Sequence, residues 1–118
     1  MDDVYELLRE AIQNKRNVYL VYDGRPRYLC PHVLGQNEDR ETGGLRYQFL
    51  AYQYDGDSSR GIFPVSDPRA VQNWRCMFLG KVTDARLIDG PWYSLSRHTM
   101  PQKCVRHDLV DFEVEGWS

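Results

Sequence analysis

The first hydrophobic pattern in the chain is typical of an amphipathic helix. Apolar residues recur three and four positions apart over residues 3–14, at Val4, Leu7, Leu8, Ala11 and Ile12. This spacing places them along one stripe of an α-helix and leaves the other positions polar. The pattern therefore predicts a single helix that packs across a sheet through its apolar face.

After the helix, the pattern changes to short runs rich in β-branched and aromatic residues, which favour strands. Pro31 lies inside the second run, which indicates a sheet edge or a bulge at that point. One helix followed by five or six short antiparallel strands predicts an α+β, mainly β fold, built as a small open barrel. The predicted strands cover residues 17–22, 27–35, 45–54, 73–80, 82–88 (a fifth strand or a continuation of the fourth) and 109–115.

The fourth predicted strand carries charge on an apolar face. If its side chains alternate, Arg75, Met77, Leu79 and Lys81 share one face. Cations in such positions either extend to water or gather at a binding site. The second explanation requires cations and aromatic rings from neighbouring strand ends, and the chain offers Tyr22, Arg25, Arg27, Arg46 and Tyr47 there.

Composition limits the class of protein. The chain has 118 residues, of which 42% are hydrophobic, enough for one folded domain. Its net charge is −2, but residues 15–86 hold 11 Lys and Arg against 8 Asp and Glu, or +3. Twelve of the 15 basic residues are arginine, whose planar fork suits phosphate and carboxylate groups. This basic excess is far below that of a dedicated duplex-DNA binder.

Three features indicate the compartment. The cysteines Cys30, Cys76 and Cys104 are odd in number and lack a framework spacing, which predicts reduced thiols. The N-terminal stretch MDDVYELLRE is acidic, unlike a signal peptide. No apolar run approaches the length of about 18 residues that a membrane span needs. We therefore predict a cytoplasmic protein with no membrane association.

Four motifs follow one another along the chain: Ala11-Ile12 with the strand Val18-Tyr19-Leu20-Val21-Tyr22, then residues 27–31, residues 47–52, and Arg75-Cys76-Met77 with Lys81-Val82. In this order they resemble the WYL domain, a bacterial ligand-sensing module, and the first of them matches its opening. Arg27-Tyr28-Leu29-Cys30-Pro31 corresponds to Arg-x-Val-x-Pro, and Tyr47-Gln48-Phe49-Leu50-Ala51-Tyr52 corresponds to Trp-Tyr-Leu-x-Ala-Tyr. Arg75-Cys76-Met77 corresponds to Arg-x-Phe, and Lys81-Val82 stands at the later Arg-Ile. The similarity covers residues 8–88.

The resemblance implies one SH3- or Sm-like domain over residues 1–118. The helix would occupy residues 1–15, the barrel residues 16–88 and a C-terminal extension residues 89–118. WYL domains usually follow a helix-turn-helix domain, whereas one helix precedes the strands here, so the chain resembles the short stand-alone members. The implied function is regulatory and non-enzymatic: sensing a negatively charged ligand, such as a nucleotide or short single-stranded nucleic acid.

The resemblance also implies a set of ligand-binding residues. By position, Arg27, Arg75 and Lys81 would hold phosphates, while Tyr22, Tyr47 and Gln48 would line the patch. Arg25 and Arg46 join this set because they lie next to the same strand ends.

Two of these positions depart from the family pattern. Gln48 replaces the name-giving tyrosine, and Lys81 replaces an arginine and its planar fork. These departures favour an alternative function. In it, the chain is a protein-interaction or assembly subunit with a degenerate patch, which binds a protein partner or forms a homo-oligomer.

Three other chemistries have weaker signals. Cys30 and His32, with Cys104 and His107, have the right types for zinc, but the two pairs lie far apart in the sequence. Ser94, Ser96 and His98 lack the elbow motif and the acid of a serine hydrolase. Asp55, Asp57 and Ser58 lack the closing glutamate of a calcium loop. We predict no catalytic residue, no metal and no cofactor.

Overall fold

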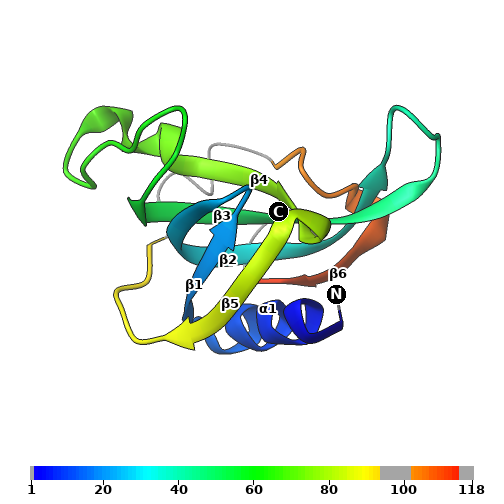
Figure 1. Cartoon of the computed structure of the whole chain (residues 1–118), viewed down its shortest axis with the longest axis horizontal. Coiled ribbons are helices and arrows are strands. Elements are labelled where there is room, and N and C mark those ends of the chain that lie inside the picture. Colours follow the sequence, from blue (N-terminus) through cyan, green and yellow to red (C-terminus); the bar gives the residue numbers. More distant parts are fainter. Residues whose placement is uncertain (1, 94–101, 115–118) are drawn as a thin grey trace.

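The computed structural model describes residues 2–93 and 102–114 of the chain (Figure 1). The single helix and the strand-rich remainder confirm the α+β, mainly β class. Three short 3-10 helices interrupt the strands. The elements are α1 (Asp2–Asn14), β1 (Asn17–Tyr22), β2 (Arg25–Glu38), β3 (Leu45–Gly56), η1 (Pro68–Asn73), β4 (Trp74–Phe78), η2 (Leu79–Lys81), β5 (Val82–Ile88), η3 (His107–Leu109) and β6 (Val110–Glu113).

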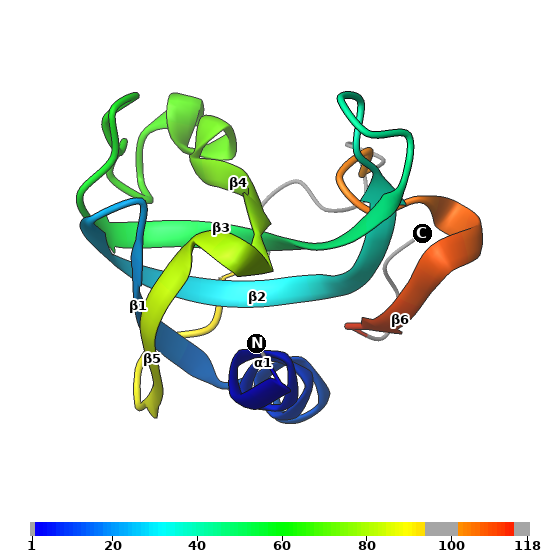
Figure 2. The same cartoon turned by 45° about the vertical axis from the view of Figure 1, so that its right-hand side comes forward.

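All six strands belong to one antiparallel sheet. Its order is β4-β3-β2-β1-β5, and β6 pairs with β2 off this path. The strands are not closed into a barrel: β4 and β5 are the two ends of the strand order in a curved, open sheet (Figure 2). The SH3- or Sm-like arrangement of the predicted open barrel stays a prediction. The short helix η2 redirects the chain between them, so β4 ends at Phe78. The hydroxyl of Tyr22 at the end of β1 accepts a hydrogen bond from the Phe78 backbone N–H (3.0 Å), which is a contact between side chain and backbone rather than a strand ladder.

The central strand β2 is bent by a bulge. Pro31 pairs with Ala51 of β3 and Val33 pairs with Leu50, so His32 is the extra residue. The bulge predicted at Pro31 is therefore confirmed, and the edge alternative is wrong. Along its other side, β2 pairs first with β1 and then with β6. Segment 91–93 fills the interval between them, where the Tyr93 carbonyl oxygen lies 2.8 Å from His32 Nε2.

Two hydrophobic clusters hold the sheet. The larger lies between α1 and the sheet and includes the fully buried Leu8, Leu20 and Phe49. Figures 1 and 2 show α1 packed across the sheet, as its apolar stripe predicts. The smaller cluster is completed by Cys104 and Val105. These two residues belong to residues 102–114, which we call the C-terminal segment. The segment thus contributes to the core of the domain.

The cysteines differ from the sequence prediction. Cys76 of β4 and Cys104 form a disulfide, whereas Cys30 is free and buried. The prediction of reduced thiols is therefore wrong for two of the three cysteines. Packing of the C-terminal segment against the sheet joins two residues 28 apart in sequence. The cytoplasmic location drew on reduced thiols and stays a prediction. Within the described residues, no helix has the length and apolar character of a membrane span.

Gly35 is a point of close approach between β2 and the C-terminal segment. A Cβ at this position would meet the Leu109 carbonyl oxygen and lie 2.6 Å from Val105 Cγ1. Gly35→Ala should therefore lower the free energy of unfolding by about 1–3 kcal/mol in urea titrations, through overpacking. Gly80→Ala is the control, since a Cβ there has no heavy atom within 4 Å. A Gly35→Ala protein as stable as wild type would contradict this packing.

Candidate functional site

Two of the predicted ligand residues, Arg27 and Arg75, reach the same face of β3 from its two neighbouring strands. Arg27 Nη1 donates to Gln53 Oε1 of β3 (3.2 Å). Arg75 of β4 pairs with Ala51 of β3, two positions before Gln53. Residues two apart in a strand share a face, so the two arginines gather on one side of the sheet.

Arg75 is held by backbone carbonyl groups. Its side chain is buried, with the residue only 4% exposed. Nη1 donates to the carbonyl oxygens of Gln72 (2.6 Å) and Trp74 (3.3 Å), and Nη2 donates to that of Gly61 (2.8 Å). These bonds attach β4 to the loop that follows β3.

Burial leaves the charge of Arg75 poorly compensated. Desolvation lowers its pKa to about 10, and the positive charges of Arg60 and Arg27 add to this effect. Among the described residues, no carboxylate forms an ion pair with Arg75. Its buried Nε atom also has no hydrogen-bond partner there. Both observations describe a cation that lacks an anionic neighbour.

Arg27 has a similar environment. It is 7% exposed, and its guanidinium carbon lies 5.1 Å from the centre of the Tyr22 ring. Burial lowers its pKa, and its buried Nε atom has no hydrogen-bond partner among the described residues. A buried polar group without a partner costs free energy, and an anion that pairs with it removes that cost.

Arg46 and Lys81 form a second group around Phe78. The Arg46 guanidinium carbon lies 3.8 Å from the centre of the Phe78 ring, and Lys81 Nζ lies 5.5 Å from it. These residues line a hollow of about 460 Å³ together with Leu45 and Tyr47. Aromatic rings beside cations suit a base that stacks and a phosphate that pairs with the cations.

Tyr22 connects the two groups. Its ring contacts Arg27, and its hydroxyl accepts the Phe78 N–H hydrogen bond. By register, Phe78 pairs with Gln48 and Arg75 pairs with Ala51, so Phe78 and Arg75 leave opposite faces of β4. Tyr22 is the contact between the two groups, and we call Arg27, Arg75, Arg46, Lys81 and Phe78 together the arginine–Phe78 surface.

The remaining predicted residues have other partners. Arg25 is half-buried and forms an ion pair with Asp57 (3.2 Å), and Arg46 also pairs with Asp39 (3.5 Å). Gln48 is 6% exposed, and its amide donates to the Cys104 carbonyl oxygen (2.9 Å). Gln48 lies three residues before Ala51 in β3, so its side chain is on the face of the sheet opposite Arg75.

Sequence reasoning missed Phe78. Strict alternation over residues 73–82 placed it on the face opposite Lys81. The helix η2 breaks that alternation, so Lys81 instead reaches the Phe78 ring. Arg60 was also missed, because it lies in a loop without a motif. Its proximity to Arg75 is a tertiary contact that no sequence spacing encodes.

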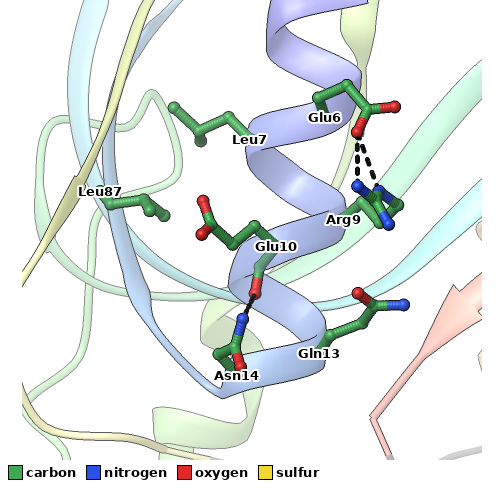
Figure 3. A pocket seen from close by; sticks show the side chains of 7 residues that line it. All are labelled: Glu6, Leu7, Arg9, Glu10, Gln13, Asn14 and Leu87. Atoms are coloured by element: carbon green, nitrogen blue, oxygen red, sulfur yellow. Dashed lines mark hydrogen bonds and ion pairs between the residues drawn. The ribbon is translucent and has the colours of Figure 1, made fainter.

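A separate hollow of about 460 Å³ lies beside α1 (Figure 3). Glu6, Arg9 and Glu10 line it on the helix, and Leu87 lines it on β5. The Arg9 guanidinium pairs with the Glu6 carboxylate (2.7 Å). With its one cation already paired, this hollow suits an anionic ligand less well than the arginine–Phe78 surface.

The structure describes the candidate zinc and calcium residues but not the candidate hydrolase residues. Cys104 shares a disulfide and offers no thiolate to zinc, and His32 lies edge to face with Trp74 in the interior. No cluster of three or more metal-ligating side chains occurs in residues 2–93 and 102–114. Asp55 Oδ1 accepts the Gly56 N–H, as in a turn. The possible nucleophiles Ser94 and Ser96, and His98, lie outside the described residues.

No protein-family model, curated protein or solved structure matches the chain. The resemblance to the WYL domain therefore rests on the four motifs and stays a prediction.

Arg75→Met should expose the loop after β3 to protease. The substitution leaves the carbonyl groups of Gly61 and Gln72 without these donors, while the Trp74 carbonyl oxygen keeps the hydrogen bond from Arg60 Nη2 (3.4 Å). Because lost buried hydrogen bonds cost on the order of 1–3 kcal/mol each, tryptic cleavage after the adjacent Arg60 should accelerate about tenfold or more. Mass spectrometry of timed digests measures this rate.

The matched control is Arg86→Met. Arg86 is an exposed arginine on β5 whose guanidinium lies over the Tyr19 ring (4.8 Å). This variant should be cleaved at Arg60 at the wild-type rate. If the Arg75→Met protein were also cleaved at that rate, Arg75 would not restrain the loop.

Proposed function

We propose that this protein is a non-enzymatic regulatory module that binds a negatively charged ligand on the arginine–Phe78 surface. The ligand class is a nucleotide or a short single-stranded nucleic acid. One observation carries the proposal: Arg27 and Arg75 are both buried, each has an unpartnered Nε atom, and neither forms an ion pair with a carboxylate among the described residues. An oxyanion would supply the missing acceptor and the missing charge.

The two parts of the surface support different parts of such a ligand. A phosphate beside Arg27 and Arg75 would also feel the positive charge of Arg60, from the loop after β3. Phe78 and Tyr47 offer ring faces in the neighbouring hollow. Stacking on a protein aromatic ring contributes about 1–3 kcal/mol per base and tolerates any base. The surface therefore favours phosphate and base together over a simple inorganic anion.

The four motifs that resemble the WYL domain add support from the sequence. Of the positions that the resemblance assigns to a ligand, Arg27, Arg75, Lys81, Tyr22 and Tyr47 lie in or beside this surface, whereas Gln48 is buried against Cys104. The curved, open sheet is compatible with an SH3- or Sm-like arrangement.

One observation favours a second candidate function, a protein-interaction or assembly subunit. In the described residues, β4 and β5 are sheet edges with one strand neighbour each. Such edges accept an added strand from a partner or from another copy. Size-exclusion chromatography with light scattering tests self-association. A strict monomer that captures no partner would count against this candidate.

Removing the exposed cations beside Phe78 should weaken nucleic-acid binding. The double variant Arg46→Gln/Lys81→Gln should bind a labelled random pool of single-stranded oligonucleotides less tightly in fluorescence-anisotropy titrations. If each cation contacts one phosphate, the slope of log K against log salt should become less steep by about 1.4. Both side chains lie at the surface, so the fold should persist.

The control is Lys15→Gln/Arg86→Gln, which makes the same change in net charge. Both residues are exposed. This protein should bind with the wild-type affinity and salt slope. Equal weakening in the two double variants would indicate attraction by net charge alone and would contradict a site on the arginine–Phe78 surface.

A further inference from the structure

The first part of the C-terminal segment, residues 102–106, is attached by one covalent bond and by hydrogen bonds near it. Cys104 forms the disulfide with Cys76 of β4. The Cys104 carbonyl oxygen accepts hydrogen bonds from the side-chain amides of Asn37 and Gln48, both at 2.9 Å. The Arg106 backbone N–H donates to the Gln36 carbonyl oxygen (3.0 Å).

The later part of the segment has its own anchors. Strand β6 pairs with β2, and Val114 N–H donates to the His32 carbonyl oxygen (2.8 Å). The Tyr5 hydroxyl of α1 donates to Asp111 Oδ2 (2.6 Å). The two parts of the segment are therefore held by separate contacts, and the disulfide belongs to the first part, residues 102–106.

The two sulfur atoms differ in access. Cys76 is an exposed residue of the edge strand β4, whereas Cys104 is buried, at 6% exposure. A reducing thiolate therefore reaches Cys76 first, and Cys104 becomes the leaving group. Gln48 Nε2 lies 3.2 Å from Cys76 Sγ and 3.8 Å from Cys104 Sγ, so its N–H can stabilise a thiolate at either position.

The third cysteine is separated from this pair. Cys30 is buried, and burial raises the pKa of its thiol to about 11. Its sulfur lies 3.5 Å from the Pro91 carbonyl oxygen and 3.4 Å from the Tyr93 backbone nitrogen. Since only a thiolate attacks a disulfide, Cys30 does not compete in exchange.

We propose that Cys76–Cys104 is a reversible redox site whose reduction releases residues 102–106 from the sheet while β6 stays paired. A dithiol reductant attacks Cys76 Sγ, the S–S bond breaks, and Cys104 leaves as a thiolate that takes up a proton. The second thiol of the reductant then displaces Cys76 from the mixed disulfide. The two electrons come from the dithiol, which is oxidised to its own disulfide.

Release has a structural consequence on β3. Gln48 would lose the Cys104 carbonyl oxygen, and Leu50 would lose its cover from Val105 in the smaller core cluster. A hollow of about 580 Å³ is lined there by Lys103 and Gln48, together with Arg46 and Phe78. The last two residues belong to the arginine–Phe78 surface, so the redox state of the disulfide acts beside the proposed ligand site. The redox site does not depend on that proposed function.

The test combines thiol counting with amide hydrogen exchange. Alkylation and mass spectrometry of the protein without reductant should find Cys76 and Cys104 protected as a disulfide. After treatment with a dithiol, the Arg106 amide should exchange about tenfold faster or more, because a constraint on its segment is lost. The Val114 amide, directly after β6, should keep its rate and serves as the internal control.

Two variants complete the test. Cys76→Ser should show fast exchange at Arg106 with or without reductant, and Cys30→Ser should keep the wild-type response. Alkylation of all three cysteines without reductant would overturn the proposal. An Arg106 exchange rate that is the same in the oxidised and the reduced protein would also overturn it. Equal acceleration at Val114 would show general loss of structure and would also overturn it. None of these readouts involves a ligand, so a failure here is distinct from a failure of the proposed function.

Discussion

The burial of two guanidinium groups without a carboxylate partner is the constraint that organises one side of the molecule. Arg75 bonds to the carbonyl groups of Gly61 and Gln72 and thereby places the loop between β3 and β4. Arg27 bonds to Gln53, whose amide in turn donates to the Asp57 carbonyl oxygen (2.9 Å) in the same loop. Backbone carbonyls satisfy donors but neutralise no charge. The same residues that build this region therefore leave it attractive to an anion.

The bent strand β2 organises the opposite side. Its bulge at His32 lets β1 and β6 pair with different stretches of the same edge, and the chain at 91–93 covers the interval between them. The C-terminal segment then fills the smaller core cluster, and the disulfide attaches it to the edge strand β4. Gln48 contacts both sulfurs of that disulfide while its neighbour Tyr47 lines the hollow at Phe78, so β3 connects the two sides.

Local patterns predicted the elements well and the long-range contacts poorly. The helix followed from its 3.6-residue period, and the bulge followed from Pro31, because proline cannot donate to a strand ladder. The three-residue helix η2 was not predicted, because residues 73–80 follow a strand pattern to their end while β4 stops at Phe78. The disulfide was missed because it depends on where the C-terminal segment packs. The motifs selected Arg27 and Arg75. Their burial and the absence of a carboxylate in an ion pair with either of them, among the described residues, depend on how the strands assemble into the sheet.

The most direct measurement concerns the two unpartnered Nε–H groups. Their NMR signals can be assigned with Arg27→Lys and Arg75→Lys proteins and followed during titration with pyrophosphate and then with a short single-stranded oligonucleotide. If the buried arginines bind an anion, both Nε–H signals will shift and saturate, and the oligonucleotide will also move signals of Phe78. If both Nε–H signals stay in place while exposed arginines such as Arg86 respond, the buried pair serves the fold alone and the anion site is disproved.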